Sequence, residues 1–407
     1  MELNIEFAGL ELKNPLIVSA GEHTVKLWQI KRAEKFGAAA ISTKLAFLKR
    51  PFDAYPRFYV DKGLWVMPIT GLRLNVEEAQ KLIRAAKKET KIPIIANIMG
   101  PGNDLSGWVK LAKMVEDAGA DMIELNMSCP NIGLMATQMG LPPPRGDLGA
   151  ALGSSPQLSK EVTKSVVEAV QIPVITKMTP VAPNIAAVAK ACEEGGASAI
   201  SAINCPQGAV PVDIFNDGKP LFVGLEGFSF GGLCGPAIRP LAYRMVGQIY
   251  QKVKVPIAGG GGLMNWRHAV EMIMYGATAV TFCTAIMFYG FELLRSIEKG
   301  LKEYMEKQGY DSIEDFRGAA LKHLTLPEKL QYHPVTPIVD EEKCNGCGIC
   351  ARMGHCRVYE VVDGKAKTVR VEECYGCGTC YKLCPTEAIS YKIGEEKHPA
   401  VQEPLEP

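Results

Sequence analysis

Eight short apolar runs alternate with amphipathic segments over the first 283 residues, and this alternation restricts the folds open to the chain. The runs are PLIVSA (15–20), AAAISTK (38–44), PIIANIM (93–99), DMIELN (121–126), PVITKM (173–178), SAISAIN (198–204), VPIAGG (255–260) and ATAVTFC (277–283). Segments of helical periodicity separate them, such as 76–89 and 158–170. Eight strands with intervening helices predict an α/β fold, a closed (β/α)8 TIM barrel. A doubly wound sheet is the runner-up, but no GxGxxG sequence follows the first run.

Eight of the 13 cysteines are concentrated in two closely spaced runs near the end of the sequence. The second run, 374–384, reads CxxCxxCxxxCP, the pattern of bacterial ferredoxins. The first run, 344–356, departs from that pattern because five residues separate its last two cysteines. The density of thiols predicts metal binding rather than disulfides in a chain without a signal peptide.

We expect these runs to hold two 4Fe-4S clusters in a ferredoxin-like domain. In ferredoxins of this type the last cysteine of a run ligates the other cluster. The first expected ligand set is Cys344, Cys347, Cys350 and Cys384, and the second is Cys374, Cys377, Cys380 and Cys356. A zinc site or a single-cluster ferredoxin is the alternative for the irregular first run.

The domain organisation follows from where these two patterns end. We expect a barrel over residues 1–318, a proline-bearing linker over 319–339, the ferredoxin-like domain over 340–395 and a mobile tail over 396–407.

Charge and hydropathy exclude several classes of function. The 45 Lys and Arg residues balance 44 Asp and Glu residues, so nucleic-acid binding is not expected. No apolar run approaches the roughly 18 residues of a membrane span. A signal peptide begins with basic residues followed by an apolar segment, whereas this sequence carries Glu2 and Glu6 near its start. We therefore expect a cytoplasmic protein.

The barrel interpretation places chemistry at the carboxyl ends of the strands. Polar or small residues follow the apolar runs at these ends: Ala20, Gly21, Thr43, Lys44, Asn97, Asn126, Cys129, Lys177, Asn204, Cys205, Gly259 to Gly262, Cys283 and Thr284. Solvated turns could explain one or two of them, but not so many at equivalent places.

The glycine run 259–262 after the seventh strand, with Thr284 after the eighth, lies where barrels commonly bind a phosphate. A phosphate site together with iron–sulfur clusters indicates FMN, with Lys44 and Lys177 stabilising the reduced ring. A tight glycine turn without a ligand is the alternative. The expected FMN-binding residues are Ala20, Gly21, Thr43, Lys44, Asn97, Lys177, Gly235, Gly261, Gly262, Cys283 and Thr284.

Five segments together resemble one family: NMSCPN (126–131), TKMTP (176–180), PIAGGGGL (256–263), GLRLNVE (71–77) and the cysteine-rich tail. They resemble the dihydropyrimidine dehydrogenases, above all the bacterial catalytic subunit with FMN and iron–sulfur clusters. The class 1 dihydroorotate dehydrogenases are similar more distantly. The resemblance implies that Cys129 exchanges a proton with pyrimidine C5, opposite hydride transfer between flavin N5 and C6. A buried structural thiol is the other interpretation of Cys129.

The resemblance also implies a substrate site, but this sequence matches the family's substrate-binding residues at only some positions. Asn75 and Glu77 match an Asn-x-Glu pair of the family, and Asn126 and Asn204 match its ring-binding asparagines. Cys205 stands where the family has threonine, and Asn131 follows the dihydroorotate pattern. We therefore expect reduction or oxidation of the C5–C6 bond in a uracil-like or thymine-like cyclic amide.

Several alternatives stay open. A dihydroorotate dehydrogenase with a fused ferredoxin is disfavoured because Glu77 would repel the carboxylate of orotate. Another cyclic enone or amide could be the substrate. A non-catalytic electron-transfer subunit is disfavoured by the retention of Cys129. The loop 132–155 could be a lid or a partner contact. Glu22 and His23 could touch substrate or flavin, but a solvated loop is the favoured expectation.

The expected electron donor is a separate FAD-containing subunit that oxidises NAD(P)H, as the resemblance implies, or a ferredoxin. The chain carries no GxGxxG sequence of its own for a dinucleotide. We expect a homodimer or a hetero-oligomer.

Overall fold

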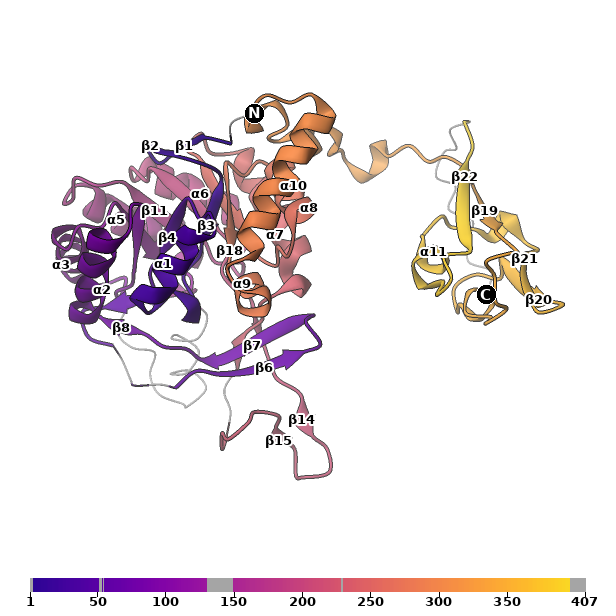
Figure 1. The fold of residues 1–407 in the computed structure, drawn as a ribbon, viewed down its shortest axis with the longest axis horizontal. Coiled ribbons are helices and arrows are strands. Elements are labelled where there is room, and N and C mark those ends of the chain that lie inside the picture. Colours follow the sequence, from indigo (N-terminus) through magenta and orange to yellow (C-terminus); the bar gives the residue numbers. More distant parts are fainter. Residues whose placement is uncertain (1–2, 51–52, 54, 130–148, 228–229, 396–407) are drawn as a thin grey trace. The chain divides into compact units, whose positions relative to one another are not determined.

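The computed structural model of the chain describes residues 3–50, 53, 55–129, 149–227 and 230–395 (Figure 1). Its internal contacts divide the chain into two compact units, Met1–His323 and Leu324–Pro407. This division lies within the segment predicted to be a linker, and the predicted tail 396–407 lies outside the described residues. None of the helices in the described ranges has both the length and the apolar character needed to cross a lipid bilayer.

Eight parallel strands of the first unit close into a barrel, which confirms the predicted fold class (Figure 1). The closure pairs β18 with β3, where Phe282 lies opposite Val18. Each predicted apolar run contains one strand: β3 (Leu16–Val18), β4 (Ala40–Ser42), β9 (Ile94–Ile98), β10 (Met122–Asn126), β11 (Val174–Lys177), β12 (Ala199–Ala202), β17 (Ile257–Gly260) and β18 (Ala279–Phe282). Because all eight are parallel, their carboxyl ends share one face of the barrel.

Helices pack around the barrel between successive strands. They are α1 (Leu27–Lys35), α2 (Val76–Glu89), α3 (Leu105–Asp117), α5 (Pro156–Val167), α6 (Ile185–Glu194), α7 (Arg239–Tyr250), α8 (Trp266–Met274) and α10 (Leu293–Gln308), with the short α9 (Thr284–Tyr289) after β18. In α2 the buried residues Ala79, Ile83 and Ala86 recur with helical spacing, and Lys87 and Lys88 lie in the last turn.

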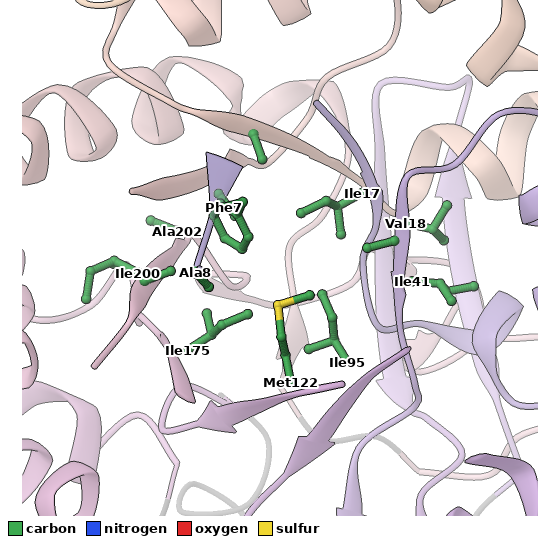
Figure 2. Packing of buried hydrophobic residues seen from close by; sticks show 14 of the residues in the cluster. Phe7, Ala8, Ile17, Val18, Ile41, Ile95, Met122, Ile175, Ile200 and Ala202 are labelled. Atoms are coloured by element: carbon green, nitrogen blue, oxygen red, sulfur yellow. The ribbon is translucent and has the colours of Figure 1, made fainter. Parts of the chain in front are cut away.

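An N-terminal hairpin, β1 (Ile5–Phe7) and β2 (Leu10–Leu12), contributes to the same core. Phe7 is fully buried. Figure 2 shows Phe7 and Ala8 beside strand side chains that include Ile175 and Ile200. The hairpin therefore packs into the apolar interior of the barrel.

Two insertions lie beside the strand ends. The first, between β4 and α2, contains β5 (Ala46–Phe47), β6 (Arg57–Asp61), β7 (Trp65–Thr70) and β8 (Leu74–Asn75). The second, after β12, contains β13 (Gln207–Gly208), β14 (Val212–Asp213), β15 (Lys219–Pro220) and β16 (Gly231–Gly232). Val66 and Cys234 exchange two backbone hydrogen bonds of 3.0 and 2.8 Å, so the two insertions are joined.

The described residues of the second unit form two antiparallel strand pairs, one short α-helix and several 3-10 turns. β19 (Val335–Val339) pairs with β22 (Ile389–Ile393), and β20 (Tyr359–Val362) pairs with β21 (Lys365–Thr368). Helix α11 (Thr379–Leu383) carries Cys380. The core consists of Val358, Tyr359, Ala366, Ala388 and Ile389 together with buried cysteines. β19 belongs to this unit although it lies within the predicted linker.

Candidate active site

Two cavities that share a wall lie among the carboxyl ends of the barrel strands. The shared residues are Ala20, Lys177, Asn204, Cys205, Cys234, Cys283 and Thr284. The first cavity also contains Gly21, Lys44, Asn126 and Cys129, with Phe58 and Val66 from the first insertion. The second also contains Ser19, Gly235, Gly261 and Gly262. The structure thus brings together most of the residues predicted to bind cofactor or substrate.

Asn75 and Glu77 do not line either cavity. Asn75 is the N-cap residue of α2, and its side-chain oxygen accepts the backbone N–H of Arg50 at 2.8 Å. Glu77 is exposed in the first turn of α2. The Asn75 side-chain oxygen is therefore bound to Arg50, and the structure places neither Asn75 nor Glu77 in the lining of the two cavities, so their substrate role stays a prediction. Asn131 and residues 132–148 of the predicted lid lie outside the described residues.

Thr43 and Asn97 lie behind the strand ends, where both are fully buried. The Asn97 N–H donates to Thr43 Oγ1 at 3.3 Å. Asn97 also donates its side-chain amide to Glu124, a residue that the sequence analysis missed. Glu124 lies in β10, is 5% exposed, and accepts a hydrogen bond from Ser42 at 3.1 Å.

Glu124 forms the acidic half of a buried ion pair. Its carboxylate lies 3.9 Å from Lys177 Nζ, and both side chains are less than a tenth exposed. A buried lysine without a nearby anion would be strongly disfavoured in its charged form. Glu124 therefore places a carboxylate beside Lys177 where that lysine borders both cavities. A glutamate inside the apolar run MIELN is the signal that could have identified it.

The asparagine side chains at the strand ends are held in fixed orientations. Asn204 donates to Ser128 Oγ at 2.8 Å, and Ser128 Oγ donates to Asn126 Oδ1 at 3.0 Å. Asn126 in turn donates to Asn97 Oδ1 at 3.1 Å. These hydrogen bonds fix the orientation of each amide, that is, where its oxygen and its nitrogen lie. The amide groups are therefore preorganised for a planar ligand.

A second ion pair borders the first cavity. Lys44 Nζ lies 2.9 Å from Glu22 Oε1, with both side chains less than a fifth exposed. Glu22 also accepts the backbone N–H of Leu72 at 3.1 Å. The expectation that Glu22 and His23 lie in a solvated loop is wrong, because the first insertion covers Glu22 and His23 is 7% exposed.

Arg73 adds a third cation to the first cavity. It is 8% exposed, and its guanidinium donates to the Gly71 carbonyl at 3.3 Å. The sequence analysis did not select it, although it lies inside the family-like segment GLRLNVE. Its position in the cavity wall can favour an anionic group on a ligand.

Cys129 follows β10 and is half-buried in the wall of the first cavity. Its carbonyl accepts the N–H of Ala150 at 3.3 Å. Gly149 has φ +56°, and a Cβ there would come within 2.3 Å of the Cys129 oxygen. A glycine is thus required for the returning chain to support Cys129 so closely.

The glycine turn after β17 forms a cradle in the second cavity. Gly261 and Gly262 have φ of +127° and +75°, and a Cβ on Gly262 would lie 2.6 Å from the Gly235 carbonyl. Side chains are excluded from this turn by both conformation and space. Bare backbone beside Thr284 fits the binding of a phosphate group.

The cysteines of the second unit separate into two sets. Cys344, Cys347, Cys350 and Cys384 line one small cavity. The pKa of Cys374 is raised by burial first and then by the neighbouring thiols Cys380, Cys356 and Cys377. The cysteines thus group as the ferredoxin pattern predicts, and their ligation of two clusters stays a prediction.

Hydrogen-bond donors surround the sulfur atoms of these cysteines. The N–H of Ala366 points to Cys344 Sγ at 3.4 Å, and the N–H of Ala388 points to Cys384 Sγ at 3.2 Å. Such donors suit cysteine thiolates that ligate a cluster. Within the described residues, no three His, Cys, Asp or Glu side chains are grouped to hold one metal ion. In a four-iron cluster each cysteine ligates a different iron, so its ligands are spread more widely.

His23 is buried beside the first cavity and carries no charge. Its two ring nitrogens have no hydrogen-bond partner among the described residues. Burial, and then the positive charge of Lys44, lower the pKa of His23 from 6.5 to about 3. The ring packs edge-on against Phe291, with 6.2 Å between ring centroids. His23 therefore acts as a neutral packing group at neutral pH.

Comparisons with known proteins cover both units. A family profile described as dihydroorotate dehydrogenase matches residues 2–305, and one described as a 4Fe-4S binding domain matches residues 367–390. The NAD-dependent dihydropyrimidine dehydrogenase subunit PreA of Escherichia coli (strain K12) is 30% identical over 419 residues, covering 98% of each chain.

Catalytic subunits of dihydroorotate dehydrogenase B (NAD(+)) are similar over the barrel. That of Methanothermobacter thermautotrophicus is 32% identical over 78% of this chain and 98% of its own length. That of Caldicellulosiruptor bescii is 35% identical, with coverages of 78% and 99%. The resemblance inferred from the motifs is confirmed.

The buried His23 makes the stability of the barrel depend on pH. Below pH 6.5 the unfolded chain binds a proton at this residue, whereas the folded chain does so only near pH 3. The folded state should therefore lose stability as the pH falls from about 6.5 towards 3. We expect His23→Phe to weaken this dependence, as measured by thermal unfolding of the barrel between pH 7.5 and 5. An unchanged slope in the variant would contradict the burial of a neutral histidine.

Proposed function

Because the chain belongs to the dihydroorotate dehydrogenase family, we propose that it reduces or oxidises the C5–C6 bond of a pyrimidine-like cyclic amide. It is an oxidoreductase of the class that acts on CH–CH groups. The observation that carries the proposal is the convergence of Cys129, Asn126, Asn204, Lys44 and Lys177 on one cavity. A titratable thiol, planar amides and two cations are the groups that this reaction requires.

The residues around the shared wall fit FMN. Gly235, Gly261, Gly262 and Thr284 would hold its phosphate, and Ala20, Gly21, Lys44, Lys177 and Cys283 would surround its ring. When bound, FMN supplies hydride chemistry at N5 and exchanges single electrons with iron–sulfur centres. Lys44 and Lys177 provide positive charge that favours a reduced, anionic ring. Thr43 and Asn97 support this wall from behind, Asn97 through Glu124 and Asn126.

Cys129 acts as the general acid and base. Its thiol protonates the substrate carbon during reduction and its thiolate removes that proton during oxidation. The hydrogen bond from Ala150 and the close approach of Gly149 position the Cys129 backbone for this proton transfer. Asn126 and Asn204 orient the substrate amides, and the Cys205 thiol borders the same cavity. The role of Asn131 remains a prediction from the sequence.

Replacing Cys129 with Ala or Ser tests this role. We expect turnover to fall by roughly 10²–10⁴, the usual contribution of a positioned acid–base group. Flavin absorbance and iron content should remain at wild-type levels, because the cofactor residues are unaffected. Turnover of substrate under anaerobic conditions is the measurement. Wild-type turnover in the Ala variant would reduce Cys129 to a packing residue.

The second unit supplies the path for single electrons. We assign one 4Fe-4S cluster to Cys344, Cys347, Cys350 and Cys384, and the other to Cys374, Cys377, Cys380 and Cys356. The family match over 367–390 supports a 4Fe-4S site at the second run. The cavity lined by Cys344, Cys347, Cys350 and Cys384 supports a further cluster at that set and the crossed pairing.

The electron donor is proposed to be a second protein. The relatives are named as subunits of NAD-dependent enzymes, and this chain carries no GxGxxG sequence for a dinucleotide. We therefore propose an FAD-containing subunit that oxidises NAD(P)H and passes electrons to a cluster, with a ferredoxin as the alternative donor. The assembly is then a hetero-oligomer.

A variant in the second cysteine run distinguishes electron entry from the donor protein from reduction of the flavin by substrate. Cys377→Ala should lose the iron of one cluster, because Cys377 is an assigned ligand. Reduction by the donor protein should stop, while substrate should still bleach the flavin absorbance. Tyr375→Ala is a matched control, since Tyr375 is 78% exposed in the same run and should keep all of the iron. Loss of FMN from the Cys377 variant would instead assign the second unit a structural role.

A carboxylated pyrimidine is the second candidate substrate. The argument against orotate relied on Glu77, and Glu77 is exposed on α2 rather than in the cavity. Arg73, by contrast, lines the first cavity and would favour a carboxylate. Dihydroorotate is therefore included beside dihydrouracil among the substrates to be tested.

A further inference from the structure

Cys205 and Cys234 are opposite each other on two adjacent segments of the second insertion. β13 and β16 are antiparallel, with Gln207 opposite Gly232 and Gly208 opposite Gly231. Continuing this register towards the barrel places Cys205 opposite Cys234. The hydrogen bond from Leu233 N to the Pro206 carbonyl, at 2.7 Å, shows that the register does continue.

The hydrogen-bonding pattern brings the two side chains close together. Leu233 and Pro206 form the hydrogen-bonded pair, so the next pair, Cys205 and Cys234, is a non-hydrogen-bonded one. The backbone groups of Cys234 accordingly bond to Val66 on the other side. In a non-hydrogen-bonded pair the Cα atoms are about 4.5 Å apart. This is within the range of about 4.4–6.8 Å that a disulfide requires.

The two thiols differ in their readiness to react. The Cys234 thiol donates to the Gly232 carbonyl at 3.7 Å. Its proximity to Cys205 lowers the pKa of the Cys205 thiol against the effect of burial. The positive charges of Lys177 and Lys44 lower it further. The neighbouring Cys205 sulfur, and then burial, raise the pKa of Cys234 well above its ordinary value. Cys205 therefore resembles an attacking thiol and Cys234 a resolving thiol.

We propose that Cys205 and Cys234 form a thiol–disulfide exchange site in the wall of the two cavities, with small-molecule disulfides as the reactant. The Cys205 thiolate attacks one sulfur of the reactant, forming a mixed disulfide and releasing one thiolate. The sulfur of Cys234, after losing its proton, then attacks Cys205 Sγ and displaces the second thiolate. Two protein thiols are oxidised, one disulfide is reduced to two thiols, and the two protons go to those products.

The reaction would alter the active site because both sulfurs line both cavities. Closing the bond removes the thiol of Cys205, which borders the amides of Asn204 and Asn126. Resting on the proposed function, we expect the disulfide form to reduce substrate at least tenfold more slowly, and a dithiol reductant to restore the rate.

The test uses the full chain with its cofactors, kept anaerobic and equilibrated with mixtures of oxidised and reduced glutathione. After alkylation of free thiols and digestion, mass spectrometry should find Cys205 joined to Cys234, in a fraction that rises with oxidised glutathione. In Cys234→Ser the cross-link should be absent, with glutathione retained on Cys205. In Cys205→Ser, Cys234 should remain a free thiol.

Cys283→Ser is the matched control, because Cys283 lines both cavities but lies outside the antiparallel register. This variant should form the Cys205–Cys234 cross-link as the wild type does. Glutathione that stays on Cys205 in the wild type, absence of any cross-link, or a link from Cys205 to Cys283 or Cys129 would overturn the inference. The mapping requires no substrate, so a cross-link found without substrate turnover would refute the proposed function and leave this site intact.

Discussion

Closure of the parallel barrel is the constraint on which the rest of the structure depends. Because β18 pairs with β3, every strand delivers its carboxyl end to one face. Lys44, Asn126, Lys177 and Asn204 come from four different strand ends and still meet in one cavity. These four residues are far apart in the sequence, and each follows a different strand. The site therefore exists only when the barrel is closed.

Buried charge pairs shape the site that closure creates. Lys177 is balanced by Glu124, and Lys44 is balanced by Glu22. In each pair the carboxylate offsets part of the desolvation cost of its lysine. Hydrogen bonds from Ser42 and Leu72 offset part of the cost of burying the two carboxylates. Two cations can then face the proposed flavin without leaving uncompensated charge in the core.

The sequence predicted the barrel well because apolar runs and helical periodicity are local signals. It also predicted the strand-end residues, since position after a buried strand is itself a local property. It failed where a role depends on tertiary neighbours. Glu22 accepts a hydrogen bond from Leu72 of an insertion that periodicity does not locate, and His23 is buried against Phe291. Asn75 lies at the start of α2 outside both cavities, so its substrate role stays a prediction. The pairing of Cys205 with Cys234 depends on a register between segments about 25 residues apart, which composition cannot reveal.

The proposed reaction is an exchange of electrons between this cavity and a dihydropyrimidine. It is tested by the flavin absorbance of the oxidised protein after anaerobic addition of dihydrouracil or dihydroorotate. We expect rapid bleaching by at least one of them, with dihydroorotate preferred if Arg73 binds a carboxylate. A flavin that is bound but bleached by neither compound would show that the cavity does not carry out this reaction.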